Sequence, residues 1–118
     1  MSAPAELSAE DRKLVTLARS AQARTGAAEG AAVRDLDGRT YAAATVALPS
    51  LSVSALGVCV AMAVSSGARG LEAAVLLSDT DISATDRAAL RDLGGDAVAV
   101  HVADPSGRLR TPPNTPEE

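Results

Sequence analysis

The spacing of apolar residues near the start of the chain predicts an amphipathic helix. The apolar side chains recur at the i, i+3, i+4 and i+7 positions of one helix face, namely Leu14, Leu17, Ala18 and Ala21. Ser8 is followed three residues later by Asp11, which has the form of a capping box. We therefore expect a helix that begins after Ser8 and ends near Arg24.

A second helix is expected at residues 54–67, a stretch without one charged side chain. Apolar side chains occur at every angle of its 3.6-residue period, which is typical of a helix buried on all sides. Small residues recur every fourth position on two adjacent stripes, and such stripes let a neighbouring element approach closely. We expect a subunit interface there that includes Ala55, Gly57, Cys59, Ala61 and Ala63.

The segment between these helices has the pattern of a hairpin. Asp37 and Gly38 form a strong hairpin signal between a strand at residues 30–36 and a returning strand at 39–48. Pro49 and the serines after it are expected to break the sheet and lead into the central helix.

The second half of the chain alternates strands with a short helix. Residues 72–78 have the apolar composition of a strand covered on both faces. Ser83 with Asp86 repeats the capping signature before a short helix that stops at two glycines. A second apolar strand at 97–103 and a short edge strand at 108–110 complete the pattern.

The order α-β-β-α-β-α-β-β predicts an α/β fold. We expect a three-layer α/β/α sandwich with a mixed five-stranded sheet. Residues 1–111 are predicted to form one domain, and the proline-rich residues 112–118 a disordered tail.

The core of this domain must be built from small side chains. The 118 residues contain no Phe and no Trp, and Tyr41 is the single aromatic residue. Apolar burial contributes about 25 cal/mol per Å², so a small domain with an alanine-rich core is weakly stable alone. We therefore predict a homo-oligomer, either a dimer or a tetramer, and allow for a further protein partner.

Charge and composition exclude several classes of partner. The net charge is −4 and the basic residues are scattered, which argues against nucleic acid as a partner. The apolar run at residues 56–64 is far shorter than the roughly 20 residues that span a bilayer, and no signal-peptide pattern is present. Cys59 is the only cysteine, which suits a reducing compartment. We expect a cytoplasmic protein without a membrane partner, and the preference for Arg over Lys suggests a bacterial source.

Five segments resemble, in order and spacing, the cytidine deaminase family of small zinc-dependent nucleoside deaminases. They are Glu29-Gly30-Ala31-Ala32-Val33, Asp37-Gly38-Arg39, Ala63-Val64-Ser65-Ser66-Gly67, Ala89-Leu90-Arg91-Asp92-Leu93-Gly94 and Asp104-Pro105-Ser106-Gly107. The resemblance covers about residues 8–111 and implies a cytidine deaminase-like fold. The closing C-terminal helix of the family has no counterpart in this sequence.

The resemblance also implies a zinc site for which the chain lacks residues. In the family, three Cys or His ligands hold a zinc ion that activates water, and a neighbouring Glu shuttles protons. The first ligand motif falls on residues 56–58, or on 59–61 after a small shift, and neither contains Glu. The second falls on 82–86, where its two cysteines become Ser83 and Asp86. With one Cys and one His in the chain, we expect no catalytic residues, no metal and no cofactor.

The substrate-binding residues of the family are also replaced. The family's Asn and Glu that hold the ribose fall on Thr45 and Ala47, and Ala27 stands where the family has a pocket Phe. The sequence therefore leaves the substrate-binding residues, if any, unknown.

Several polar residues have a structural and a functional interpretation. Cys59 is either a core residue or a reactive thiol, and His101 is either a hydrogen-bonded structural residue or a catalytic one. A metal site shared by both across subunits is a third interpretation. Ser83 and Asp86 either cap a helix or replace zinc ligands, and Tyr41 either packs on the hairpin or holds a ligand. We favour the structural interpretation of each.

The combination of a retained fold and missing catalytic residues suggests a function. We expect a catalytically inactive cytidine deaminase-fold protein, a pseudoenzyme that acts as an oligomeric structural or interaction protein. The alternative is a non-catalytic binding module for a nucleoside or another small metabolite. An active deaminase-type hydrolase with unorthodox ligands is the least favoured of the three hypotheses, and the fold alone does not decide among them.

Overall fold

The structure, a computed structural model, describes residues 7–110. Its elements are α1 (Ala9–Thr25), β1 (Gly30–Asp35), β2 (Thr40–Ala44), β3 (Val46–Leu48), β4 (Leu51–Val53), α2 (Ala55–Ser65), β5 (Leu71–Leu77), α3 (Ala84–Gly94), the 3-10 turn η1 (Gly95–Ala97) and β6 (Ala99–Ala103). The tail predicted at residues 112–118 lies outside the described residues, as do residues 1–6 and 111 of the predicted domain.

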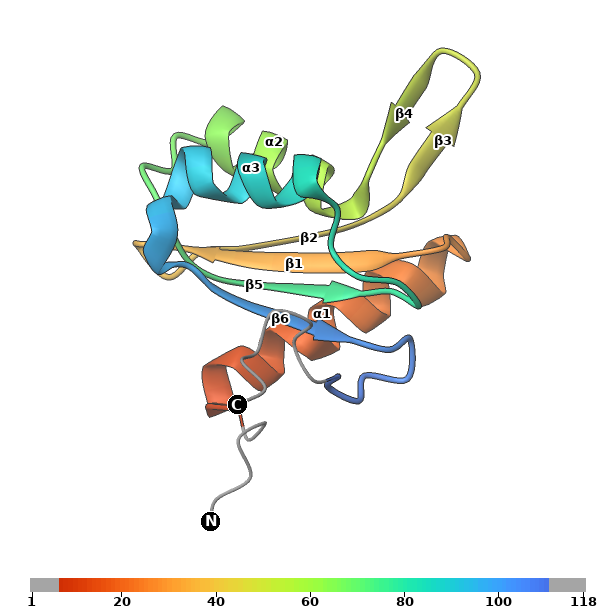
Figure 1. Ribbon diagram of the computed structural model, residues 1–118, viewed down its shortest axis with the longest axis horizontal. Coiled ribbons are helices and arrows are strands. Elements are labelled where there is room, and N and C mark those ends of the chain that lie inside the picture. Colours follow the sequence, from red (N-terminus) through yellow and green to blue (C-terminus); the bar gives the residue numbers. More distant parts are fainter. Residues whose placement is uncertain (1–6, 111–118) are drawn as a thin grey trace.

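One mixed sheet lies between two layers of helices (Figure 1). Its strand order is β2-β1-β5-β6. β1 is antiparallel to both of its neighbours, whereas β5 and β6 are parallel. α1 covers one face of the sheet, and α2 and α3 cover the other. The predicted α/β/α sandwich with a mixed sheet is therefore confirmed.

Small and medium-sized apolar side chains fill both spaces between sheet and helices. The cluster on the α1 side contains Leu14, Ala18, Val75 and Leu77. The cluster on the other side contains Leu56, Cys59, Leu76 and Leu90. α1 lies so close to β1 that a Cβ atom at Gly30 would overlap the carbonyl oxygen of Ala18. The absence of a side chain at this position sets the distance between the two layers.

The described part of the main sheet has four strands rather than the predicted five. The segment expected as an edge strand at 108–110 makes only an isolated bridge between Leu109 and Ala103. The reason is the preceding turn, in which the Asp104 carboxylate accepts hydrogen bonds from the amides of Ser106 and Arg108. This turn occupies the chain through Arg108, and so only a short stretch can pair with β6.

The returning strand is shorter than predicted, and a second hairpin follows it. β2 ends at Ala44 because Thr45 turns toward the residue before β1, where its Oγ1 accepts a 3.1 Å hydrogen bond from the Glu29 amide. β3 and β4 then pair in a separate two-stranded sheet. Pro49 does not lead into the helix but lies in the turn of this hairpin, where its missing N–H removes no ladder bond.

The central helix α2 is buried on one side only. Its sheet-facing residues, at most 1% exposed, are Ala55, Leu56, Cys59 and Ala63. In contrast, Val64 is 55% exposed and Ala61 also faces away from the core. Within the single chain the prediction of burial on all sides is wrong, because part of the uncharged outer face of α2 is exposed. Within residues 7–110, no helix combines the length and the apolar character needed to cross a membrane.

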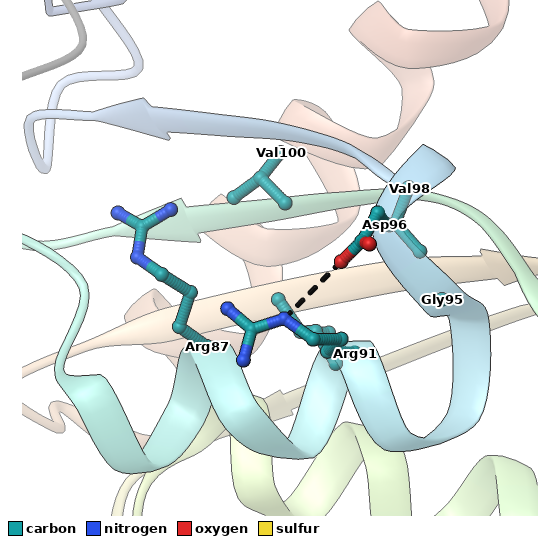
Figure 2. A pocket seen from close by; sticks show the side chains of 7 residues that line it. Arg87, Arg91, Gly95, Asp96, Val98 and Val100 are labelled. Carbon is teal, nitrogen blue, oxygen red and sulfur yellow. Dashed lines mark ion pairs between the residues drawn. The ribbon is translucent and has the colours of Figure 1, made fainter. Parts of the chain in front are cut away.

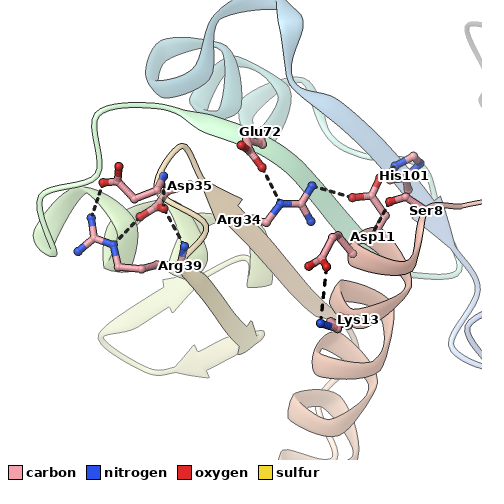
Figure 3. A network of polar contacts seen from close by, with 10 residues as sticks. Ser8, Asp11, Lys13, Arg34, Asp35, Arg39, Glu72 and His101 are labelled. Atoms are coloured by element: carbon pink, nitrogen blue, oxygen red, sulfur yellow. Dashed lines mark hydrogen bonds and ion pairs between the residues drawn. The ribbon is translucent and has the colours of Figure 1, made fainter.

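A network of charged side chains ties α1 to three strands of the sheet (Figure 3). Arg34 on β1 donates from Nη2 to Asp11 Oδ1 at 2.9 Å and from Nε to Glu72 Oε1 at 2.7 Å. His101 Nε2 on β6 lies 3.0 Å from Asp11 Oδ2. Burial disfavours the ionised Asp11, but the hydrogen bonds from Arg34 and His101 hold the pKa of its carboxyl below the ordinary value. His101 is hydrogen-bonded to α1, as the structural interpretation of this residue predicts.

The β1–β2 hairpin is organised by the buried carboxylate of Asp35, which is 0% exposed. Asp35 Oδ1 accepts 2.9 Å hydrogen bonds from the amides of Asp37 and Arg39. Asp35 Oδ2 accepts hydrogen bonds from Arg39 Nε at 3.0 Å, visible in Figure 3, and from the Tyr41 hydroxyl at 2.8 Å. Burial opposes ionisation, but the hydrogen bonds from Tyr41 and the turn amides hold the pKa of Asp35 below its ordinary value.

We predict that Asp35→Asn lowers the free energy of unfolding at neutral pH by about 1–3 kcal/mol, because the amide cannot satisfy all the donors around it. Because the pKa of Asp35 is lower in the folded state, its ionised form contributes stability above the unfolded pKa of about 3.9. That contribution is lost as the pH falls through the folded pKa. Urea unfolding at neutral and acidic pH should therefore show a gap between the two proteins that narrows in acid.

Asp37→Asn is the matched control, because Asp37 lies in the same turn with its side chain 61% exposed. We expect that variant to differ little from the natural protein at either pH. Equal destabilisation by the two variants would contradict a special role for the buried carboxylate.

Candidate functional site

The first turns of α2 and α3 and the carboxyl ends of β5 and β6 lie at one edge of the sheet (Figure 1). Ligands of many α/β proteins bind at this kind of edge, where helix N-termini and strand ends converge. The segments onto which the zinc motifs of the resemblance fall, 56–58 and 82–86, begin α2 and α3. This edge is therefore the candidate functional site.

A hydrogen bond between Ser54 and Asp86 joins the two helix N-termini. Ser54 is the N-cap of α2, and its Oγ accepts a 3.0 Å hydrogen bond from the Gly57 amide. The same hydroxyl donates to Asp86 Oδ1 at 2.6 Å. Asp86 is 7% exposed, and its own amide donates to Ser83 Oγ at 3.0 Å. The predicted cap by Ser83 is confirmed, and Asp86 has a second role in a contact between helices.

The side chains at this edge do not fit the zinc site that the resemblance implies. Ser54, Ser83 and Asp86 supply two hydroxyls and one carboxylate, without a thiolate or an imidazole. A catalytic zinc ion in proteins is held by three side chains, mostly His, Cys or acidic residues. Within residues 7–110, no three His, Cys, Asp or Glu side chains are arranged so that they could hold a metal ion.

Cys59 lies inside the core and takes no part in the hydrogen bond between Ser54 and Asp86. Its side chain is 0% exposed, and the thiol donates to the carbonyl oxygen of Tyr41 at 3.5 Å. Burial raises the pKa of the Cys59 thiol to about 12. A thiol that stays protonated at neutral pH is a poor nucleophile and a poor metal ligand, which agrees with the interpretation of Cys59 as a core residue.

The structure separates Cys59 from His101. Cys59 packs on the α2 side of the sheet, whereas His101 reaches Asp11 of α1 on the opposite side. The two residues therefore form no common site within one chain. Tyr41 packs against the α2-side core and uses its hydroxyl for Asp35, as the structural interpretation of this residue predicts.

A second polar cluster at the same edge was not identified from the sequence. Ser78, which is 2% exposed, donates from its Oγ to Glu29 Oε2 at 2.7 Å and accepts from the Thr80 amide at 3.0 Å. Arg110 donates to the carbonyl oxygens of Asp79 and Thr80. Glu29 and Ser78 are 49 residues apart in the chain, and no local signal connects them. The cluster closes the loop after β5 onto the segment before β1.

The positions that correspond to the family's ribose-binding residues, Thr45 and Ala47, have different surroundings and contacts in this chain. The Thr45 hydroxyl bonds to the backbone of Glu29, and Ala47 is exposed on β3. Ala27 lies in the loop between α1 and β1 and has only a methyl group to offer a ligand.

Comparisons with known proteins agree with this fold. The model of the family described as cytidine deaminase-like matches residues 7–107. No curated protein is significantly similar to the chain.

Solved structures of cytidine deaminases superpose on most of the chain. The protein from Mycobacterium tuberculosis is 25% identical with a TM-score of 0.68, over 87% of this chain and 90% of its own. The protein from Burkholderia pseudomallei is 21% identical with a TM-score of 0.71, over 83% and 87%. The protein from Mycobacterium leprae is 20% identical with a TM-score of 0.64, over 84% and 90%. The likeness extends over nearly the whole length of these enzymes.

We predict that Ser54→Ala destabilises the protein more than Ser8→Ala does. Both serines cap a helix through one 3.0 Å hydrogen bond from a backbone amide, which is worth about 1 kcal/mol. Only Ser54 also donates to a buried carboxylate, and so its removal should cost about 1–3 kcal/mol more. The measurement is the free energy of unfolding from urea denaturation.

Asp86→Ala, which removes the acceptor, completes a double-mutant cycle with Ser54→Ala. We expect a coupling energy of about 1 kcal/mol or more, because the two side chains bond directly. Purely additive effects would mean that the 2.6 Å contact contributes nothing to the connection between α2 and α3.

Proposed function

The chain belongs to the cytidine deaminase-like family, and we propose that it is a catalytically inactive member that acts as an oligomeric structural or interaction protein. The observation that carries this proposal is the Ser54–Asp86 hydrogen bond. It links the two helix N-termini at which the family resemblance places zinc ligands and a proton-transferring Glu. A hydroxyl and a carboxylate that satisfy each other there support a structural connection rather than metal-assisted deamination.

The first part of the proposal concerns catalysis. We expect the purified protein to release no ammonia from cytidine above the level of the buffer, with an active cytidine deaminase as positive control. Zinc added to the assay should make no difference, because the side chains of Ser54, Ser83 and Asp86 suit zinc poorly. Ammonia release that a chelator abolishes would contradict the proposal. A saturable rise of Tm with a pyrimidine nucleoside alone would instead favour the non-catalytic binding module.

The second part concerns the partner, and the β3–β4 hairpin supports it. The cross-strand pairs Val46–Val53 and Leu48–Leu51 lie on one face of the ribbon. Leu48 is 59% exposed and Leu51 is 54% exposed. An isolated two-stranded hairpin is only marginally stable in water. We call these four side chains the hairpin surface and propose that a second copy of the chain covers it.

The interface expected from the sequence needs a revised set of residues. Ala55, Cys59 and Ala63 are 0% exposed because they face the protein's own sheet, and so they cannot contact a partner. Gly57 and Ala61 lie on the stripe that remains accessible. At Gly57, a Cβ atom would lie 3.0 Å from Val53 Cγ1, which shows that the base of the hairpin contacts this stripe.

Gly57, Ala61 and Val64 are spaced three or four positions apart, which places them along one side of α2. The stripe runs from the hairpin along the outer side of α2 through Ala61, and reaches the exposed Val64. Contiguous exposed apolar surface on a soluble protein commonly marks a site of protein association. We propose that the homo-oligomer, a dimer or a tetramer, forms through the hairpin surface and this stripe.

We predict that the double variant Leu48→Ser, Leu51→Ser shifts the protein to a smaller assembly, because it removes both leucines of the hairpin surface. Light scattering coupled to size-exclusion chromatography measures the change. Leu36→Ser is the matched control, since Leu36 is 57% exposed on the β1–β2 turn at the other end of the molecule (Figure 1). If the natural protein is monomeric at micromolar concentration, the proposed oligomer is refuted. If Leu36→Ser dissociates the assembly, the interface includes Leu36 and the proposed location is wrong.

A further inference from the structure

A small pocket lies between α3 and the start of β6 (Figure 2). Its volume is about 110 Å³, and it is lined by Arg87, Leu90, Arg91, Gly95, Asp96, Val98 and Val100. None of these residues belongs to the Ser54–Asp86 contact or to the hairpin surface, and so the pocket is independent of the proposed function.

Two arginines one helical turn apart stand at the rim of this pocket. Like charges at i and i+4 of a helix repel each other and destabilise it slightly. Arg91 Nε contacts Asp96 Oδ1 at 3.3 Å, and the closest acidic oxygen to Arg87 Nη2, Asp81 Oδ1, is 4.0 Å away. The side chains of Arg91 and Arg87 are 56% and 36% exposed, respectively. The pair thus offers guanidinium donors that an anion can engage.

The floor of the pocket is apolar. Leu90 is 2% exposed, and Val98 and Val100 are partly buried against the same core cluster. Figure 2 shows both guanidinium groups on the side of α3 that faces β6, with Val100 on the strand behind them. A ligand in this position would contact cationic donors at one end and aliphatic side chains at the other.

We propose that this pocket binds a small carboxylate with a short aliphatic chain. Guanidinium groups bind carboxylates through paired N–H donors in a planar geometry. The pocket is small, with a volume of about 110 Å³, and its short apolar floor suits a short-chain acid. The valine floor favours an alkyl carboxylate over inorganic phosphate, because phosphate has no apolar part to bury.

The test is a titration of the full-length ¹⁵N-labelled protein with butyrate, acetate and inorganic phosphate, followed by amide NMR shifts at constant ionic strength. We expect saturable shifts at Gly95, Asp96, Val98 and Val100. Each fully buried methylene contributes about 0.8 kcal/mol, or about fourfold in affinity, so that butyrate, which has two more methylenes than acetate, should bind up to about 15-fold more tightly. Tighter binding of phosphate than of butyrate would overturn the assignment to a carboxylate.

Arg87→Gln and Arg91→Gln should each weaken butyrate binding about fivefold, the upper range for an exposed ion pair. Arg24→Gln, in the last turn of α1, is a control with the same change of charge and should bind butyrate like the natural protein. The NMR spectrum of each variant reports directly whether it is folded. No saturable shift at the pocket amides, or equal weakening by all three variants, would overturn the proposal.

Discussion

The close contact between α1 and β1 is the constraint on which the layered structure depends. Gly30 has no Cβ atom, and therefore the strand can lie directly against the carbonyl oxygen of Ala18. Small side chains bring the layers of this protein together without large apolar residues to fill a wider gap. Each of them buries little area, and so apolar burial alone stabilises the domain weakly. Polar contacts between elements consequently have more weight than in a protein with an aromatic core.

The polar contacts act at three separate places. The network around Arg34 holds α1 against the sheet, the buried Asp35 organises the first hairpin, and Ser54 with Asp86 connects α2 to α3. Each places a carboxylate where neighbouring donors satisfy it, which is the condition under which a buried charge is tolerated. In the proposed function, the hydrogen bond between Ser54 and Asp86 connects α2 to α3 at the edge where the family binds its metal.

Most of the larger aliphatic side chains lie in the core, but four of them are more than half exposed, namely Leu36, Leu48, Leu51 and Val64. Three of these four belong to the hairpin and α2, where we propose that a second copy binds. The arginine pocket on α3 is a separate feature, and a ligand there would relieve the repulsion between two like charges.

The sequence by itself determined the elements whose signals are local. The serine caps at Ser8 and Ser83 and the Asp37-Gly38 turn placed helices and a hairpin correctly, and the order of elements led to the right layers. Only the tertiary structure decided which face of α2 is buried, that residues 46–53 form their own hairpin, and that Ser54 meets Asp86. Capping and turn formation depend on residues a few positions apart, whereas burial and contacts between helices depend on residues brought together from distant parts of the chain. An uncharged helix face has the same sequence pattern whether it faces the core or a partner, and only the packed layers distinguish the two.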